Sequence, residues 1–224
     1  MNYSVILSVI NYPALFSFLL EGTVKAIELF VLTIVLSLPL GLLVARLRLS
    51  KHKIIQLPVK FYLLIMRGTP LILQLMFFMY FPSIVLHIQG IDRFMVAVFS
   101  FTINYAAYFA EIYRGGIESI PVGQQEAAHV LGLSSFQTFM RITLPQVIKR
   151  IIPTIANESM TLVKDTALAS VISVAELFKN AARMQATYSS VVPFAVAGLF
   201  YLIMNTLVSA FYSRVENKLN YYKG

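Results

Sequence analysis

Apolar residues fill long stretches of the chain, and most of the charged residues gather in the segments between them. A helix needs about 20 largely apolar residues to cross the hydrocarbon core of a bilayer. Five windows reach that length, at residues 23–45, 59–81, 94–112, 151–174 and 192–212. The pattern therefore predicts an all-α integral membrane protein with five transmembrane helices, organised as one domain over residues 1–224.

Two apolar segments depart from a simple spanning helix. The window at 59–81 contains Arg-Gly-Thr-Pro at positions 67–70, where glycine and proline weaken the helix. Irregular backbone at membrane depth is tolerated beside protein or a watery cavity, and broken helices often mark substrate sites. Residues 12–20 are apolar but too short to span. We expect them to form an interfacial helix opened by Pro13, within an N-terminal segment at 1–21.

The composition supports a membrane location. Of the 224 residues, 58% are hydrophobic and only 12% are charged, whereas soluble domains carry roughly 25% charged residues. Cysteine is absent, and His52, His87 and His129 are far apart in sequence. We therefore expect no thiolate chemistry, no metal site and no cofactor.

The net charge of +8 reflects an uneven distribution of basic residues. Twelve of the 18 lie in the segments after the first and third windows and in the C-terminal tail, and four lie on the opposite side. Lys25 and Lys60, at the window ends, are counted with the segments that they adjoin, and the remaining two, Arg67 and Lys164, fall deeper inside windows. The positive-inside rule places the N-terminus outside and the C-terminus in the cytoplasm. Charge spread over loops beside lipid also argues against nucleic-acid binding.

The cytoplasmic segment at 113–150 is far longer than a simple connection. Pro121 can open a helix, Gly132 suits a C-terminal cap, and Ser134 or Ser135 suits the next N-cap. We expect two short helices joined by a tight turn at Gly132, with Pro145 stopping or kinking the second.

The second of these helices carries an apolar stripe formed by Phe136, Phe139, Met140 and Thr143. Two interpretations remain open at this point. The stripe packs on the protein's own helix ends, or it docks into a groove of a cytosolic partner.

A motif in this segment resembles the EAA loop of bacterial ABC importer permeases. It consists of Glu126-Ala127-Ala128, Gly132 and Ile-Thr-Leu-Pro at 142–145, with matching spacing. The polar amino acid subfamily is similar over about residues 22–212, although Ala167 stands where the family commonly has Ser. The further matching segments are 67–70, 107–116, 123–125, 157–158 and 164–172.

The resemblance implies the membrane subunit of an ATP-driven importer of polar amino acids in the bacterial cytoplasmic membrane. The loop, between helices three and four, would dock onto a pair of cytosolic ATP-binding subunits. The docking residues implied are Glu126, Ala127, Ala128, Gly132, Leu133, Phe136 and Phe139. A second permease subunit, either a copy or a close paralogue, and an extracytoplasmic amino-acid-binding protein would complete the system within membrane lipid.

The chain is not expected to be an enzyme. It lacks the Gly-x-x-x-x-Gly-Lys-Ser/Thr motif of a phosphate-binding loop. ATP hydrolysis is therefore expected on a separate chain.

The fourth window contains Glu158, Lys164 and Asp165. A charge at the bilayer centre costs at least ~2.5–3.5 kcal/mol, so such groups usually face a cavity or a partner. Glu158 and Asp165, seven residues apart, share a helix face, and Lys164 and Asn157 flank it. Together they could bind both ends of a zwitterion. The alternative is that Lys164 pairs with a carboxylate to stabilise packing, and the family resemblance favours the pathway.

Two residues outside this window join the candidate pathway, Thr69 at the break in the second window and Asn104 in the third. Arg67 is ambiguous, because it could pair structurally with Glu111. The alternative function is an ion-coupled secondary transporter of amino acids with Glu158 or Asp165 as a proton relay, and a membrane enzyme ranks last.

Overall fold

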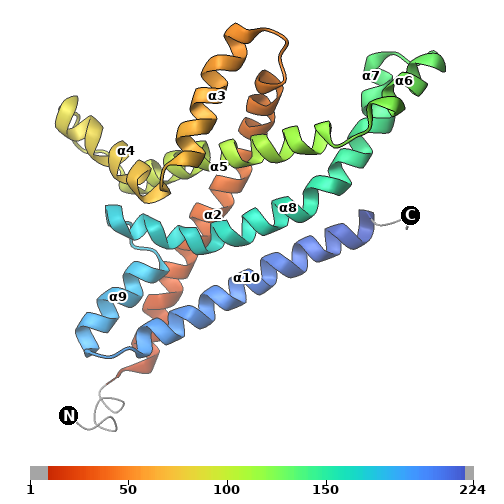
Figure 1. The fold of residues 1–224 in the computed structure, drawn as a ribbon. Coiled ribbons are helices and arrows are strands. Elements are labelled where there is room, and N and C mark those ends of the chain that lie inside the picture. Colours follow the sequence, from red (N-terminus) through yellow and green to blue (C-terminus); the bar gives the residue numbers. More distant parts are fainter. Residues whose placement is uncertain (1–9, 220–224) are drawn as a thin grey trace. The chain divides into compact units, whose positions relative to one another are not determined.

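The computed structural model describes residues 10–219, and within that range it contains helices and no strand. The all-α fold class is confirmed for these residues (Figure 1). The α-helices are α2 (Tyr12–Arg48), α3 (Lys53–Gly68), α4 (Leu71–Val85), α5 (Arg93–Glu118), α6 (Val122–Val130), α7 (Ser135–Thr138), α8 (Leu144–Asp165), α9 (Leu177–Tyr188) and α10 (Val192–Leu219). A π-helix, η1 (Phe139–Thr143), precedes α8, and a 3-10 helix, η2 (Thr166–Ile172), follows it.

Among the described residues, three helices are long and apolar enough to cross a membrane, namely α2, α5 and α10. The pair α3 and α4 would make a fourth span if counted together, although the two helices meet at a bend of 109°. The bend falls at the predicted break in the second window. Five transmembrane helices remain a prediction.

Helix α2 corrects the prediction for the N-terminal segment. It runs without interruption over 37 residues from Tyr12 to Arg48, so residues 12–20 do not form a separate helix. Pro13 lies in its first turn, where the missing N–H is tolerated. At 1.5 Å per residue the helix is about 55 Å long, and part of it extends beyond a hydrocarbon core of about 30 Å.

The start and end of α8 also differ from expectation. Pro145 does not stop the second loop helix, because α7 passes through the π-helix directly into α8. Pro145 is the second residue of α8, so its missing N–H falls directly after the π-helix, where the hydrogen-bonding pattern changes to that of an α-helix. The α-helix ends at Asp165 and gives way to η2, so residues 151–174 are not one regular α-helix.

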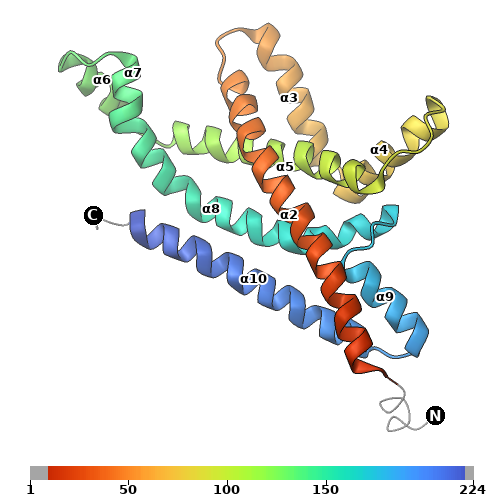
Figure 2. The same ribbon diagram turned by 180° about the vertical axis from the view of Figure 1, so that it is seen from behind.

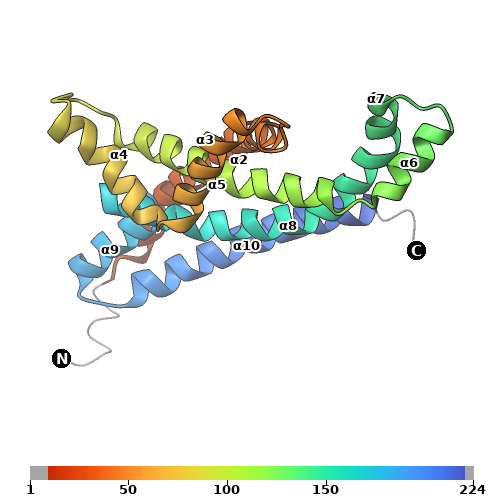
Figure 3. The same ribbon diagram turned by 45° about the horizontal axis from the view of Figure 1, so that its top comes forward.

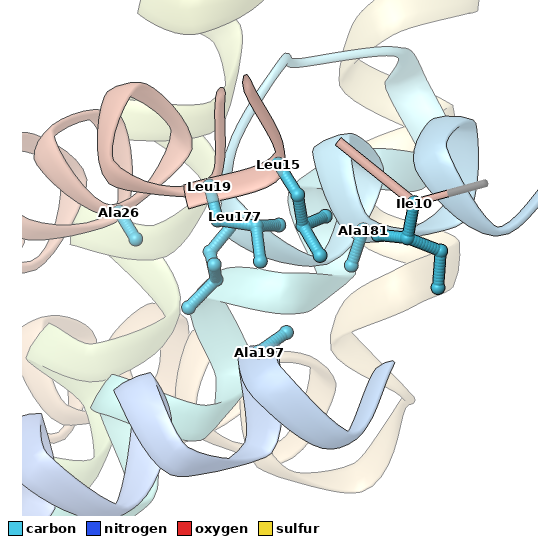
Figure 4. Close-up of a cluster of buried hydrophobic side chains, with 7 residues drawn as sticks. All are labelled: Ile10, Leu15, Leu19, Ala26, Leu177, Ala181 and Ala197. Atoms are coloured by element: carbon cyan, nitrogen blue, oxygen red, sulfur yellow. The ribbon is translucent and has the colours of Figure 1, made fainter. Parts of the chain in front are cut away.

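The chain forms two compact units. Within the described residues, the first comprises 10–35, 69–102 and 160–207. Its core gathers side chains from α2, α9 and α10 (Figure 4). The buried members are Ile10, Leu15, Leu19, Ala26, Leu177, Ala181 and Ala197.

A buried carboxylate caps α9 in this unit. Glu176 is fully buried and accepts hydrogen bonds from the backbone N–H groups of Phe178 and Lys179, each at 2.7 Å. The Tyr201 hydroxyl of α10 lies 3.0 Å from the same carboxylate and donates to it. Burial raises the pKa of the Glu176 carboxyl to about 7, although these hydrogen bonds and Lys179 oppose the rise. The carboxylate thus links the start of α9 to α10.

The second unit comprises residues 36–68, 103–159 and 208–219 of the described chain. Figure 2 shows α3 returning alongside the end of α2, and Ala45, Leu63, Ala107 and Ala110 form a core that joins these two helices to α5. Helix α8 packs against Gly116 of α5, where any larger side chain would collide with Ile151. This close approach of α5 and α8 positions the site described next.

Candidate functional site

Helix α8 carries polar side chains on one face and apolar side chains on the other. The exposed polar positions recur every three or four residues, the spacing of one helix face. They are Arg150, Thr154, Asn157, Thr161 and Lys164. The opposite, buried face contains Val147, Ile151, Ile155, Ser159 and Leu162. Because a face of this polarity is poorly accommodated by hydrocarbon, it requires water or another protein surface.

The four candidate residues predicted on this segment all belong to α8. Asn157 and Lys164 lie on the exposed polar face, whereas Glu158 and Asp165 are half-buried at its border. Glu158 and Asp165 thus flank the face on which Asn157 and Lys164 lie, and contact of these four residues with a substrate stays a prediction.

Arg150, Thr154 and Thr161 also lie on this face, and the sequence analysis did not identify them as candidates. The three- and four-residue spacing of polar residues was the signal that could have identified them. A single threonine, or an arginine near the start of a helix, does not indicate a polar face.

A cavity of about 560 Å³ lies in the second unit between α5 and α8. Tyr108, Glu111 and Arg114 line it from α5, and Arg150 and Glu158 line it from α8. The volume is in the range of small-molecule pockets. Guanidinium and carboxylate groups in one cavity can contact the two ends of a zwitterion.

Ion pairs organise one wall of this cavity. Arg114 lies 2.8 Å from Glu111 and 2.5 Å from Glu118. Arg67 lies 3.4 Å from Glu111, and its guanidinium lies over the Tyr108 ring, 5.5 Å from the centroid. The structural pairing of Arg67 with Glu111, which the sequence left open, is present.

Backbone groups freed by the break between α3 and α4 find side-chain partners. In the second unit, the buried Asn104 amide donates a 2.8 Å hydrogen bond to the Met66 carbonyl near the end of α3. In the first unit, the Gln74 amide donates to the Thr69 hydroxyl at 2.8 Å and to the Thr69 carbonyl at 3.2 Å. The predicted residues Asn104 and Thr69 thus stabilise the break between the helices, and their contact with a substrate stays a prediction.

The long loop contains the expected helical hairpin, formed by α6 and α7 (Figure 3). Gly132 has φ of +76°, a left-handed conformation that favours glycine. Ser134 caps α7 in a reciprocal capping box with Gln137. Pro121 is the N-cap of α6 rather than its first residue. Gln124 and Gln146 exchange amide hydrogen bonds that tie α6 to α8.

The hairpin exposes large apolar side chains. Val130, Leu131 and Phe136 are 88%, 79% and 73% exposed. Val130 and Leu131 were missed as candidates, and two consecutive apolar residues before a turn glycine were the available signal. Exposed apolar groups concentrated in one short hairpin are typical of a docking surface.

The predicted docking residues differ in their accessibility. Glu126, Ala127, Gly132, Phe136 and Phe139 are exposed, and Leu133 is half-buried. Ala128 is only 2% exposed and packs inside the hairpin, so it supports the surface rather than forming it.

A family model described as "binding-protein-dependent transport system inner membrane component" matches residues 37–221. The chain belongs to this family. The match covers the helix break, the cavity, the hairpin and the polar face of α8.

Relatives named as transport permeases match across most of their lengths. The chain is 36% identical to the octopine transport system permease protein OccM of Rhizobium radiobacter, covering 88% of this chain and 84% of that protein. It is also 36% identical to the arginine transport system permease protein ArtQ of Bacillus subtilis, covering 90% and 92%. Identity to a putative glutamine transport system permease protein GlnP of Rickettsia prowazekii is 32%, covering 93% and 95%.

Solved structures agree with this assignment. A chain from a crystal structure of an amino acid ABC transporter with histidines matches with a TM-score of 0.84 and 32% identity, covering 95% of this chain and 98% of that chain. A chain of the MetNI methionine ABC transporter matches with a TM-score of 0.68 at 17% identity, covering 98% and 100%, and it shows the fold alone. The chain is therefore an ABC importer permease subunit rather than a secondary transporter.

Proposed function

We propose that this permease imports polar amino acids, of cationic or zwitterionic type, and forms half of a pathway completed by a second permease subunit. The observation that carries this proposal is the polar face of α8, exposed in a chain whose long helices are otherwise apolar. Such a face is stable in a membrane when it lines water or meets a matching surface. The names of the octopine, arginine and glutamine permeases support the substrate class.

The membrane arrangement in this proposal follows the charge distribution. Five spans, including α8 and the bent pair of α3 and α4, place the N-terminus outside and the C-terminus in the cytoplasm. The α6–α7 hairpin, within residues 113–150, then faces the cytoplasm of a bacterium, and the start of α2 lies toward the outer surface. The predominance of basic residues on one side supports this orientation.

The α6–α7 hairpin is the proposed dock for one of two cytosolic ATP-binding subunits. Its exposed apolar side chains would enter a groove in the manner of an amphipathic helix. Glu126 and Ala127 lie on the exposed surface beside them. An extracytoplasmic amino-acid-binding protein would deliver the substrate on the opposite side.

The substrate pathway in this proposal uses the carboxylates of Glu158 and Asp165 for an ammonium or cationic group. Lys164 would face the substrate carboxylate, and Asn157 would contribute hydrogen bonds. Thr69 and Asn104 would contribute through the helix break. The chain itself makes and breaks no covalent bond.

Movement of the hairpin would change which side of the membrane the polar face of α8 meets. Each ligand shifts such an equilibrium only by its different affinity for the two states. ATP and the loaded binding protein would favour the outward-open state, and hydrolysis on the partner subunit would restore the inward-open state.

Uptake into proteoliposomes tests the proposal. The complete transporter, including its ATPase subunits, is reconstituted with the binding protein outside, and labelled arginine, glutamine and histidine are offered separately. We expect uptake of at least one of them with ATP inside, and none with a non-hydrolysable analogue. Uptake that follows a proton or sodium gradient without ATP, or failure to transport any of the three, would contradict the proposal.

A further inference from the structure

A second cavity, of about 440 Å³, lies in the second unit where α2 ends and α3 returns. Arg48 of α2 and Lys60 and Arg67 of α3 line it, together with Leu64 and Glu111. The transport proposal assigns no role to Arg48 or Lys60. The cavity shares Arg67 and Glu111 with the cavity between α5 and α8, and Arg48 and Lys60 are the charged residues that line it alone.

Positive charge exceeds negative charge in this cavity. Its single carboxylate, Glu111, lies 2.8 Å from Arg114 and 3.4 Å from Arg67. Within residues 10–219, neither Arg48 nor Lys60 has a carboxylate within 4.0 Å. Cationic groups beside a hydrocarbon core are stabilised by an anion that can accept their hydrogen bonds. The cavity therefore favours an anionic ligand.

An apolar stripe on α3 adjoins the cavity. Ile54, Leu57, Phe61 and Leu64 are all exposed and recur every three or four residues. Leu64 both belongs to the stripe and lines the cavity. At about 100° per residue, it lies within about 60° of Lys60 and Arg67 around the helix. The ligand thus meets a cationic pocket and, directly beside it, an apolar surface.

We propose that this cavity binds the headgroup of an anionic phospholipid, with the acyl chains lying along the α3 stripe. The phosphate would accept hydrogen bonds from the guanidinium groups of Arg48 and Arg67, which suit phosphate geometry, and an ammonium contact from Lys60. Additional basic residues at the α2–α3 connection, Lys51 and Lys53, raise the local potential for anionic lipid. A cationic or zwitterionic transport substrate matches the pocket less well, since its ammonium would meet three cations.

Lipid retention by the purified transporter complex tests this site without measuring transport. The complex is titrated with phosphatidylglycerol and phosphatidylcholine in detergent, and bound lipid is measured by native mass spectrometry. We expect preferential binding of phosphatidylglycerol. Each charge is worth about 1 kcal/mol, so the Arg48→Gln/Lys60→Gln double variant should bind it about 30-fold more weakly.

Three further variants separate the effect of the pocket from that of general surface charge and from misfolding. Lys53→Gln removes an exposed lysine of the same helix that does not line the cavity, and it should weaken binding clearly less than Lys60→Gln does. Lys60→Arg should keep the wild-type preference. If the double variant does not fold, Lys60→Gln alone should show about a fivefold loss.

Three outcomes would overturn the proposal. The first is equal retention of phosphatidylglycerol by the wild type and the pocket variants. The second is displacement of the lipid by millimolar inorganic phosphate, which would indicate a site for a soluble anion. The third is loss of permease dimerisation, rather than lipid, in the pocket variants, which would assign the cavity to a second copy of the chain.

Discussion

Helices α8 and α10 are both long enough to cross a membrane, yet their surfaces differ. Helix α10 spans 28 residues and exposes apolar side chains such as Leu199, Leu202 and Leu207. Helix α8 exposes polar side chains at the equivalent spacing and buries its apolar ones. The difference shows that exposure has two meanings in this chain, because an exposed apolar side chain suits lipid while an exposed polar one requires water or a partner.

A lysine placed on each helix gives the largest expected difference in membrane insertion. Leu202→Lys puts a charge on the apolar surface of α10 and should disfavour membrane insertion by about 2.5–3.5 kcal/mol. Asn157→Lys puts the same charge on the polar face of α8 and should insert nearly normally. Quantification of full-length protein in isolated membranes measures the difference. Equal levels of the two variants would remove the distinction between the helices.

A charge reversal tests another exposed surface, the α6–α7 hairpin, which is expected to bind a protein partner. Glu126→Arg inverts an exposed charge at the proposed dock and should weaken ATPase-subunit binding by about 2 kcal/mol, the scale of an interface hot spot. Membrane insertion should be intact. Co-purification of the ATPase subunit checks this, with Lys149→Gln, outside the hairpin, as the matched control. Undiminished recovery of the subunit would argue against the dock.

Removal of carboxylate charge from α8 tests its pathway role. Glu158→Gln and Asp165→Asn preserve side-chain size and should each reduce ATP-driven uptake at least about tenfold, equivalent to about 1.4 kcal/mol. Assembly with partner subunits should persist. Leu207→Ile on α10 is the control and should transport normally. Normal uptake by both carboxylate variants would exclude them from the pathway.

The polar contact of α10 with Glu176 predicts a dependence of stability on pH. The pKa of this carboxyl is about 7 in the folded chain, compared with 4.5 ordinarily. Since the folded state then binds more protons than the unfolded state, stability should fall as pH rises from about 4.5 to 7 and level off above it. Thermal unfolding of the solubilised complex at several pH values measures this slope. Glu176→Gln should reduce the slope, and an unchanged slope would assign it to other groups.

The smallest effect is expected where α8 and α10 share a hydrogen bond in the second unit. The hydroxyl groups of Ser159 and Tyr212 lie 2.8 Å apart. Tyr212→Phe removes this bond and should cost about 0.5–1.5 kcal/mol of stability. Phe211→Tyr at the neighbouring, exposed position is the control. Denaturant unfolding that gives the same midpoint for all three proteins would contradict the assignment.

Local signals were readable from the sequence. The hairpin follows from the residues themselves, because Gly132 adopts a positive φ at little cost and Ser134 supplies a cap. The break after Gly68 is equally local. The recurrence of polar residues every three or four positions on α8 is a third local signal, although the prediction used only part of it.

Features that depend on distant packing were not readable in the same way. The burial of Ala128 depends on how α6 folds back on α7, and alanine is compatible with either environment. The continuity of α2 through residues 12–20 was missed because hydropathy length alone cannot distinguish a surface helix from an extension of a spanning one. Of the two effects predicted for Pro145, the stop was wrong, because the helix continues past it through a local π-helical distortion.

The π-helix between α7 and α8 has a mechanical consequence. Because α7, η1 and α8 follow one another without a loop, helical backbone alone joins Phe136 to Glu158. A rotation at one end of such a continuous helical segment can be transmitted to the other end through its backbone hydrogen bonds. A partner that binds Phe136 would therefore act on the Glu158 carboxylate through this segment. The wider turns of η1 are where such a rotation would be absorbed or transmitted.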